Sequence, residues 1–153
     1  RKNPRTDRKD TMTAGFELHT RLAADCIRVG RLPLSLLLLL NDARYPWFIL
    51  VPQRSGIGEI FQLPESDQCQ LWRESANLAH NLMQSFHADK INIGALGNLV
   101  PQLHVHHIAR FTSDPAWPGP VWGHSAPVPY EKHTISERVG MACDWFGDEL
   151  EVL

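Results

Sequence analysis

Residues 98–110 read NLVPQLHVHHIAR and give the clearest structural and functional signal in the chain. Apolar and polar side chains alternate along it. This alternation predicts a β-strand, because successive side chains of a strand point to opposite faces. One face then carries Gln102, His104, His106, Ile108 and Arg110. The other carries Leu103, Val105, His107 and Ala109. The strand thus presents an amide and two imidazoles in a row, while His107 is expected on the core side.

Two imidazoles on one strand face suit phosphoryl transfer. One neutral ring can attack phosphorus if its second nitrogen donates to a fixed acceptor, and the other groups can donate to phosphate oxygens. However, His-x-His is also a metal-ligand spacing. No cysteine or acidic residue lies close in sequence to supply a third ligand. The spacing alone therefore supports three explanations about equally well: a metal site, a catalytic pair and coincidence.

The segments upstream of this strand predict a hairpin. Two apolar runs, residues 34–40 and 47–51, flank the turn-forming residues 41–46. Apolar runs joined by a short polar turn indicate antiparallel strands. A long helix is predicted from Pro64 to about Phe86, because proline and acidic residues mark its start and apolar residues recur at helical spacing.

The rest of the chain supplies two more strands and a final helix. Strands are predicted at residues 91–96 and 99–111. A capping box, Thr134 to Glu137, predicts a helix over about 136–146. Residues 1–15 are polar without apolar periodicity and are expected to form a flexible tail. Residues 16–153 are expected to form a single domain.

Composition limits the function classes. The chain has 153 residues and a net charge of −2, which argues against a general electrostatic nucleic-acid binder. The apolar run 34–40 is far shorter than the roughly 20 residues of a membrane-spanning helix. Three widely spaced cysteines favour a reducing compartment, so the cytoplasm is the expected location. Cys69 and Cys143 fall on predicted helices and are expected to be inert thiols.

The stretch 98–110 resembles the motif of the histidine-triad (HIT) proteins, which is His-φ-His-φ-His-φ-φ with φ apolar and an arginine following. Aligned on Arg110 and the Val-Pro step, Gln102 takes the place of the first histidine. His104 takes the place of the middle, nucleophilic histidine and His106 that of the third. The resemblance extends over about residues 34–111, and the Gln-x-His-x-His pattern is similar to a bacterial HIT-like subgroup.

The resemblance implies an α+β fold with an antiparallel sheet of about five strands, a long helix and a C-terminal helix. It also implies a homodimer. The implied activity is a nucleotide phosphohydrolase or nucleotidyl transferase that forms a nucleotidyl-histidine intermediate. Its substrates would be nucleoside polyphosphates, such as dinucleoside polyphosphates, or nucleoside phosphoramidates. No catalytic metal is required in the family, although a divalent ion could arrive with the nucleotide. Neither a nucleic acid nor a membrane is an implied partner.

The family motif also assigns roles to residues around His104. Gln102, Asn98 and His106 would hold phosphate oxygens, and Asn41 and Asp42 are candidate ribose contacts. Two further residues are candidates for the nucleotide site: Asn92 and Arg110, the latter being equally suited to a structural ion pair.

The chain departs from the family pattern at three positions. Gln102 replaces a histidine, His107 replaces an aliphatic residue, and Trp47 replaces a histidine that helps to orient the nucleophile. Another acceptor must therefore set the tautomer of His104. The tryptophans Trp117 and Trp122 could stack a base, but packing is the favoured interpretation. His80 and His87 are expected at the surface.

Two alternatives to the enzyme remain. One is a regulatory protein that binds a nucleotide without turning it over. The other is a metal-dependent hydrolase built on His104 and His106.

Overall fold

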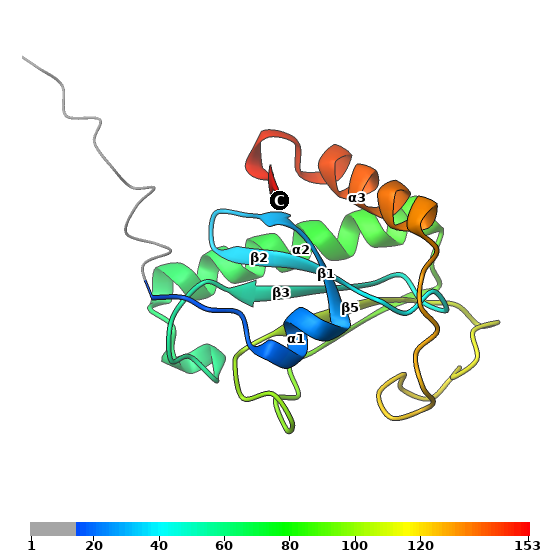
Figure 1. The fold of residues 1–153 in the computed structure, drawn as a ribbon, viewed down its shortest axis with the longest axis horizontal. Coiled ribbons are helices and arrows are strands. Elements are labelled where there is room, and N and C mark those ends of the chain that lie inside the picture. The colour runs from blue at the N-terminus through cyan, green and yellow to red at the C-terminus, as the bar shows by residue number, and fades with distance from the viewer. Residues whose placement is uncertain (1–14) are drawn as a thin grey trace, which may run out of the picture.

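A six-stranded antiparallel sheet forms the centre of the computed structural model, which describes residues 15–153 (Figure 1). The strand order is β4-β5-β3-β2-β1-β6. The strands are β1 (Cys26–Arg31), β2 (Ser35–Leu40), β3 (Trp47–Pro52), β4 (Lys90–Gly94), β5 (Val105–Arg110) and β6 (Glu151–Val152). The predicted α+β class with an antiparallel sheet is confirmed, with six strands in place of about five.

Helices cover both faces of the sheet. They are α1 (Thr20–Asp25), α2 (Glu65–Phe86) and α3 (Lys132–Phe146), with short 3-10 turns at Ile60–Gln62 and Gly147–Glu149. Residues of α2 and α3 share one apolar core with alternate residues of the strands, whereas Leu22 of α1 belongs to the core of the opposite face. Within residues 15–153, no helix combines the length and the apolar character needed to cross a membrane.

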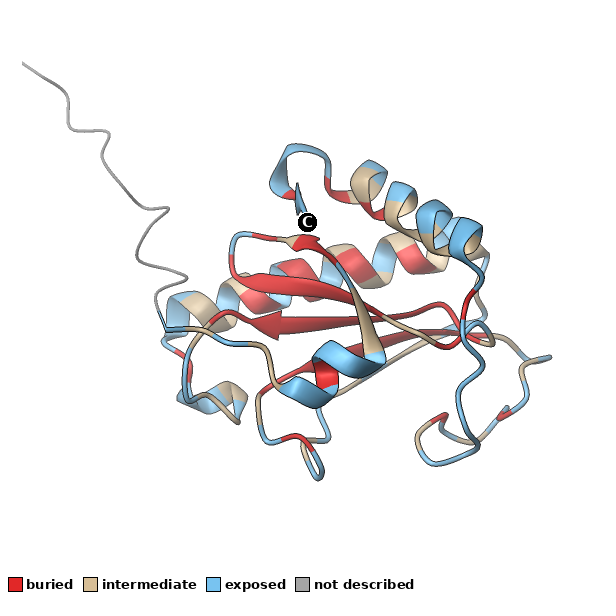
Figure 2. Cartoon of the chain, in the orientation of Figure 1, coloured by how far each residue is buried: buried red, intermediate tan, exposed pale blue. Residues whose placement is uncertain are grey.

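The predicted hairpin is confirmed. Residues of β2 and β3 pair antiparallel, with Leu37 opposite Leu50 and Leu39 opposite Phe48. Apart from Leu40, both strands are buried throughout, because each of their faces packs against an apolar core (Figure 2). Continuous apolar runs are typical of strands covered on both sides.

The long helix is also confirmed, since α2 begins one residue after Pro64 and ends at Phe86. Its buried residues recur on one side of the helix, which faces the sheet (Figure 2). His87 then adopts a left-handed conformation with φ of 51° and ends the helix.

The strand predicted at 99–111 is only half correct, because β5 begins at Val105. Pro101 has no N–H to donate to a sheet ladder. The N–H of Leu103 instead donates to the carbonyl of Ile57, at 2.9 Å. Residues 99–104 therefore cross a loop before they join the sheet. Similarly, the strand predicted at 91–96 ends at Gly94.

The predicted start of the last helix was wrong. α3 begins at Lys132, and Glu131 occupies its N-cap position without a side-chain capping bond. The predicted cap, Thr134, lies inside the first turn. Residues 1–14 lie outside the described part of the chain, so the N-terminal tail stays a prediction.

Candidate active site

The alternation of side chains along β5 separates His106 from His107 as predicted, and His104, one residue before the strand, lies on the side of His106. His107 is fully buried on the side of α2, where its Nε2 lies 2.7 Å from Oγ of Ser75. His104 and His106 lie on the other side, with 6% and 8% of their surface exposed. The core-side position of His107 is therefore confirmed, and it takes no part in the site described below.

A cavity of about 730 Å³ opens above His104 and His106. Its walls come from α1, the ends of β2 and β3, the loop after β4 and the segment 121–129. Apolar side chains form much of the lining, including Leu22, Leu40, Trp47, Ile49, Leu96, Leu99, Val100, Val121 and Trp122. The charged residues among the lining are Arg21, Asp25, Asp42 and Arg44.

A main-chain carbonyl sets the tautomer of His104. Nδ1 of His104 lies 2.7 Å from the carbonyl oxygen of Gln102. Because a carbonyl can only accept, Nδ1 carries the proton and donates it. The lone pair of His104 is therefore on Nε2, which is the arrangement that a nucleophilic imidazole requires.

The indole of Trp47 sets the opposite tautomer in His106. Its Nε1–H donates to Nδ1 of His106 at 2.9 Å. His106 then carries its own proton on Nε2, where it can act as a hydrogen-bond donor. The pKa of His106 is lowered to about 3. Burial is the largest cause, and the neighbouring His104 and His107 add to it. His106 is thus a neutral donor at neutral pH.

Aromatic rings surround His106. Trp122 approaches it edge-on with a centroid distance of 5.5 Å, and Trp122 also contacts Trp47 at 6.2 Å. Gly94 of β4 lies opposite His106 in the sheet and, having no side chain, leaves space for the indole of Trp122. A Cβ atom at Gly94 would lie 3.0 Å from Cη2 of Trp122. Nε1 of Trp122 is buried without a hydrogen-bond partner in the described structure.

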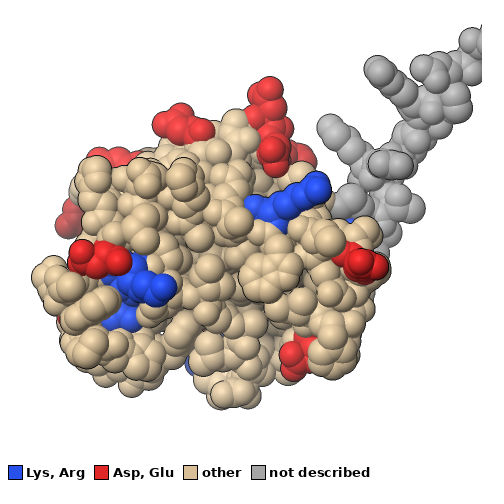
Figure 3. Space-filling view, turned by 180° about the vertical axis from the view of Figure 1, so that it is seen from behind, with Lys and Arg blue, Asp and Glu red and all other residues tan. Residues whose placement is uncertain are grey.

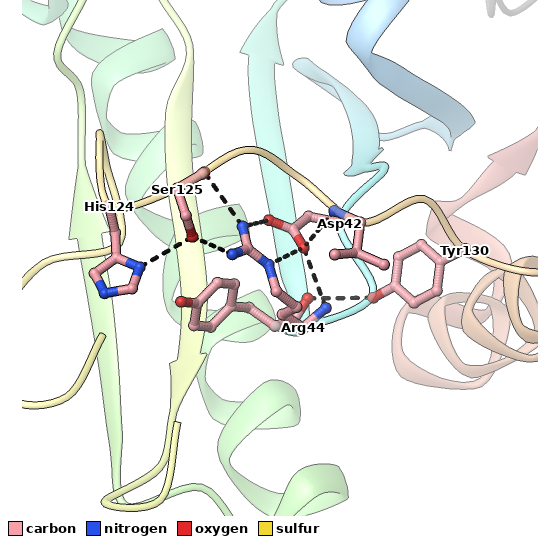
Figure 4. Close-up of polar contacts among 7 residues, drawn as sticks. Asp42, Arg44, His124, Ser125 and Tyr130 are labelled. Carbon is pink, nitrogen blue, oxygen red and sulfur yellow. Dashed lines mark hydrogen bonds and ion pairs between the residues drawn. The ribbon is translucent and has the colours of Figure 1, made fainter. Parts of the chain in front are cut away.

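The turn between β2 and β3 fastens the segment 121–130 beside the cavity (Figure 4). Arg44 binds both carboxylate oxygens of Asp42, at 2.9 Å and 2.7 Å, and also the side chain of Ser125. Asp42 accepts the N–H of Val128 at 3.3 Å. Burial alone would raise the pKa of Asp42, but the hydrogen bonds from Arg44 and Val128 lower it below its ordinary value. Asp42 therefore remains a carboxylate that holds this loop.

Three of the predicted nucleotide-binding residues line the cavity. Asn41 lines the cavity, and its Oδ1 also accepts the N–H of Tyr130 at 2.9 Å. Asp42 is only 2% exposed and already paired, so its main contact is with Arg44 rather than with a ligand. Asn98 is exposed at the rim beside Gly97, whose φ of 70° shapes the turn.

The predicted role of Gln102 in the row of catalytic groups is not supported by its side-chain position. Its Oε1 accepts the N–H of His19 at 2.9 Å, and its Nε2 donates to the carbonyl of Glu17 at 2.8 Å. The side chain therefore binds the segment that leads into α1, and it does not line the cavity. The period-two pattern does not hold at Gln102, because this residue lies in the loop before β5 and its amide binds the main chain of Glu17 and His19.

Arg110 and Asn92 also lie away from the cavity lining. Arg110 is 1% exposed and forms two hydrogen bonds with Asp114, at 2.7 Å and 3.0 Å. It also donates to Oδ1 of Asn92 at 2.7 Å and to the carbonyl of Gly119 at 2.8 Å. These contacts make Arg110 the structural ion pair that was one of its two predicted roles, and Asn92 its partner.

Sequence reasoning did not single out the contribution of α1 or the contact made by Trp47. Arg21 and Leu22 lie on a helix of six residues, which is too short to give a periodic signal. Trp47 was noted only as a departure from a family pattern. Within residues 15–153, no group of three or more His, Cys, Asp or Glu side chains is arranged to hold a metal ion.

Comparisons with known proteins agree on one family. The HIT domain model matches residues 21–113. A histidine triad protein from Marinobacter aquaeolei VT8 is 48% identical, with a TM-score of 0.85, over 88% of this chain and 98% of that one. A histidine triad protein from Sinorhizobium meliloti 1021 is 45% identical (TM-score 0.84, 86% and 98% covered). One from Bradyrhizobium japonicum is 47% identical (TM-score 0.81, 82% and 94% covered). No curated protein matches the chain.

Proposed function

The chain belongs to the HIT domain family, and from this premise we propose that it is a nucleotide hydrolase or nucleotidyl transferase with His104 as nucleophile. The observation that carries the proposal is the tautomer of His104. Its Nδ1–H donates to Gln102, so the lone pair of Nε2 is available in a cavity of about 730 Å³. A cavity of this size lies within the range of small-molecule sites.

The proposed reaction has two displacements. Nε2 of His104 attacks the α-phosphorus, a phosphorus–nitrogen bond forms, and the bond to the leaving group breaks with its electron pair going to that group. Water or another acceptor then displaces His104 and releases the nucleotide. Covalent catalysis of this kind splits one difficult step into two easier ones.

The other residues of the cavity would bind and orient the nucleotide. Nε2–H of His106 and the amide of Asn98 are donors for phosphate oxygens. Asn41, which lines the cavity, would bind the ribose, and the guanidinium groups of Arg21 and Arg44 would lie near the phosphates. The apolar wall suits a base. No cofactor is proposed, although a divalent ion could enter bound to the nucleotide phosphates.

A His104→Asn variant tests the proposal. We expect it to lose at least about 10³-fold in turnover of nucleoside polyphosphates and phosphoramidates, because the nucleophile is gone. Mass spectrometry of the native protein mixed with these substrates should find a nucleotidyl adduct on His104. His80→Asn, at an exposed position of α2, is the matched control and should keep full activity. Equal activity of the His104 variant and the native protein would refute the mechanism.

The same experiment separates the two alternatives. A regulatory nucleotide-binding protein would bind the substrates without an adduct. A metal enzyme would need stoichiometric metal and lose activity with a chelator. The arrangement of His106 disfavours the metal site, because Trp47 already donates to its Nδ1 and its Nε2 carries the proton.

We further propose that the protein acts as a homodimer, with the outer edge of β4 facing the second copy. β4 is the last strand on its side of the sheet. Large apolar side chains are exposed on it and in the loop that follows it: Ile93, Leu96 and Leu99. The side opposite to the view of Figure 1 has a broad uncharged area in its middle (Figure 3). Unpaired edges and exposed apolar groups favour association.

Light scattering during size exclusion tests this assembly. We expect twice the monomer mass for the native protein and the monomer mass for Ile93→Lys, since a lysine would place a charge in the contact. Lys90→Ile, which removes a charge from the same strand, is a suitable control and should stay dimeric. A native monomer at micromolar concentration would contradict the proposal.

A further inference from the structure

Trp47 controls the protonation of His106 through a bond that only one arrangement of protons allows. An indole nitrogen can donate but cannot accept. The 2.9 Å contact between Nε1 of Trp47 and Nδ1 of His106 therefore requires a bare Nδ1. If His106 gained a second proton, two N–H groups would face each other at a buried position.

The surroundings of His106 also disfavour a second proton on its ring. The ring is 8% exposed, and Trp122 covers it edge-on at 5.5 Å. His104 lies beside it, one residue before the start of β5, with ring centroids 4.9 Å apart. Burial lowers the pKa of His106 to about 3. In the neutral range it can donate a hydrogen bond from Nε2, but giving that proton away would leave an anionic imidazolate.

Among residues 15–153, none of the other charged residues that line the cavity provides a substitute acid. The hydrogen bond with Asp42 raises the pKa of the Arg44 guanidinium above its ordinary value, so Arg44 keeps its proton. Asp42 is bound to Arg44 as a carboxylate, and Asp25 lies 3.7 Å from Arg21 as its ion-pair partner. On the far side of the strand, His107 is enclosed by the core, and burial lowers its pKa to about 4.

We propose that Trp47 is a specificity-determining residue, which holds His106 as a neutral donor and restricts the enzyme to leaving groups that depart without gaining a proton. This inference rests on the proposed function. When Nε2 of His104 attacks the phosphorus of an anhydride, the broken bond leaves its electron pair on a phosphate oxygen. That oxygen is a weak base, with a pKa of about 6 for the second ionisation of a phosphate.

An amine leaving group differs in its proton requirement. Breaking a phosphorus–nitrogen bond to an alkylamine without protonation would expel an amide anion, which is far more basic than a phosphate. General acid catalysis is commonly worth about 10²–10⁴-fold in rate. The geometry therefore selects nucleoside phosphoric anhydrides, and other derivatives with weakly basic leaving groups, over nucleoside phosphoramidates.

The test measures how rate depends on the leaving group. Adenosine 5′-phosphate aryl esters with phenols of graded pKa, and an alkylamine phosphoramidate of the same nucleotide, are given to the native protein, Trp47→Phe and Trp47→His. For the native protein we expect the rate to fall steeply as the phenol becomes more basic, and the phosphoramidate to be at least about 10²-fold slower than the nitrophenyl ester. In Trp47→His, whose side chain can accept as well as donate, we expect that ratio to shrink by about tenfold or more.

A spectroscopic measurement on the native protein does not depend on either variant folding. The ring nitrogens of His106, labelled with nitrogen-15, should keep the Nε2–H tautomer from pH 5 to pH 8, whereas Trp47→Phe should make them titrate at a higher pH than in the native protein. Titration of native His106 in this range would overturn the inference.

The outcomes separate this inference from the proposed function. Cleavage through an adduct on His104, but with equal rates on the phosphoramidate and the nitrophenyl ester, overturns the selectivity alone. Absence of both cleavage and adduct with all the substrates overturns the proposed function and this inference with it.

Discussion

Hydrogen bonds fix the proton on each of three neighbouring histidines. His104 donates from Nδ1 to a carbonyl, and so does His107, to the carbonyl of Val105 at 3.0 Å. His106 accepts at Nδ1 from Trp47. The Nδ1–H of His107 leaves its Nε2 to accept the hydroxyl proton of Ser75. Three imidazoles within four residues thus have fixed and different proton positions: that of His104 suits the proposed nucleophile, that of His106 makes it a donor at Nε2, and that of His107 lets it bind Ser75 of α2.

Two buried histidines, His106 and His107, should make stability depend on pH. Burial lowers the pKa of His106 to about 3 and that of His107 to about 4. In the unfolded chain both would titrate near about 6.5. Between the folded and the unfolded pKa values, the unfolded chain binds more protons than the folded protein. The contribution of the two histidines to stability is therefore complete above about pH 6.5 and is lost as the pH falls towards 4. Each ring adds a slope of up to about 1.4 kcal/mol per pH unit.

Urea unfolding between pH 7.5 and pH 4.5 measures this slope. We expect the unfolding free energy of the native protein to fall steadily below about pH 6.5. A His107→Gln variant, which removes one titrating ring, should start from a lower stability but lose it less steeply. Identical slopes for the two proteins would mean that His107 is not held neutral by the fold.

At the scale of elements, the position of Trp122 depends on the absence of a side chain on β4. Gly94→Val would place carbon atoms where the indole now lies, since even a Cβ would be 3.0 Å from it. We expect Trp122 to move away from His106, kcat/KM to fall about tenfold or more, and stability to fall by about 1–3 kcal/mol. Kinetics with a nucleoside polyphosphate and urea unfolding measure the two effects.

Gly140 in α3 offers a matched control for Gly94. No atom lies within 4 Å of a Cβ built there. Gly140→Ala should therefore leave kcat/KM unchanged and stabilise the helix by about 0.5–1 kcal/mol. Unaltered kcat/KM in Gly94→Val would show that the contact between Trp122 and His106 is not needed for activity.

Strong periodic signals in the sequence predicted the elements that carry the site. Alternation placed His106 and His107 on opposite faces of β5, and apolar runs predicted the β2–β3 hairpin. These features depend on local geometry, namely the period of a strand and the chemistry of a short turn. The long helix α2 was predicted for the same reason, because its apolar residues face one core.

Other features could not be read from local patterns because distant groups decide them. The first part of the predicted strand 99–111 is diverted by a bond from Leu103 to Ile57. β6 is two residues long and exists through its pairing with Gly30 and Arg31. The motif makes Arg110 a candidate phosphate ligand, but its guanidinium binds Asp114 and the carbonyl of Gly119 instead. In each case tertiary contacts override the local signal.

At the scale of the whole molecule, segments far apart in sequence close one cavity. α1 supplies one wall, the β2–β3 turn another, and the segment 121–129 a third (Figures 1 and 4). The walls are loops and a short helix outside the central strands, whereas His104 and His106 are buried at the sheet. Binding and chemistry are therefore expected to respond separately to substitutions, the walls affecting KM and the histidines affecting kcat.

Gln102 offers a test of whether the cavity walls and the histidines affect KM and kcat separately. It connects the loop before β5 to residues 17–19, which lead into α1. Its amide makes two bonds to the main chain of Glu17 and His19, more than 80 residues away in sequence. Gln102→Ala keeps the main-chain carbonyl that orients His104 but releases residues 17–19. We expect KM for a nucleoside polyphosphate to rise about tenfold, since each lost hydrogen bond is worth about 0.5–1.5 kcal/mol, while kcat changes less than about threefold.

Two further measurements decide between this role and the catalytic one suggested by the motif. Limited proteolysis should cut the Gln102→Ala variant faster than the native protein within residues 15–25, because α1 is held less firmly. Gln102→Glu keeps the acceptor for the N–H of His19 but loses the donor to Glu17, so its KM should lie between those of the other two proteins. If turnover instead slowed by about two orders of magnitude or more while KM stayed unchanged and α1 stayed protected, the amide of Gln102 would have to act on the phosphate during the reaction.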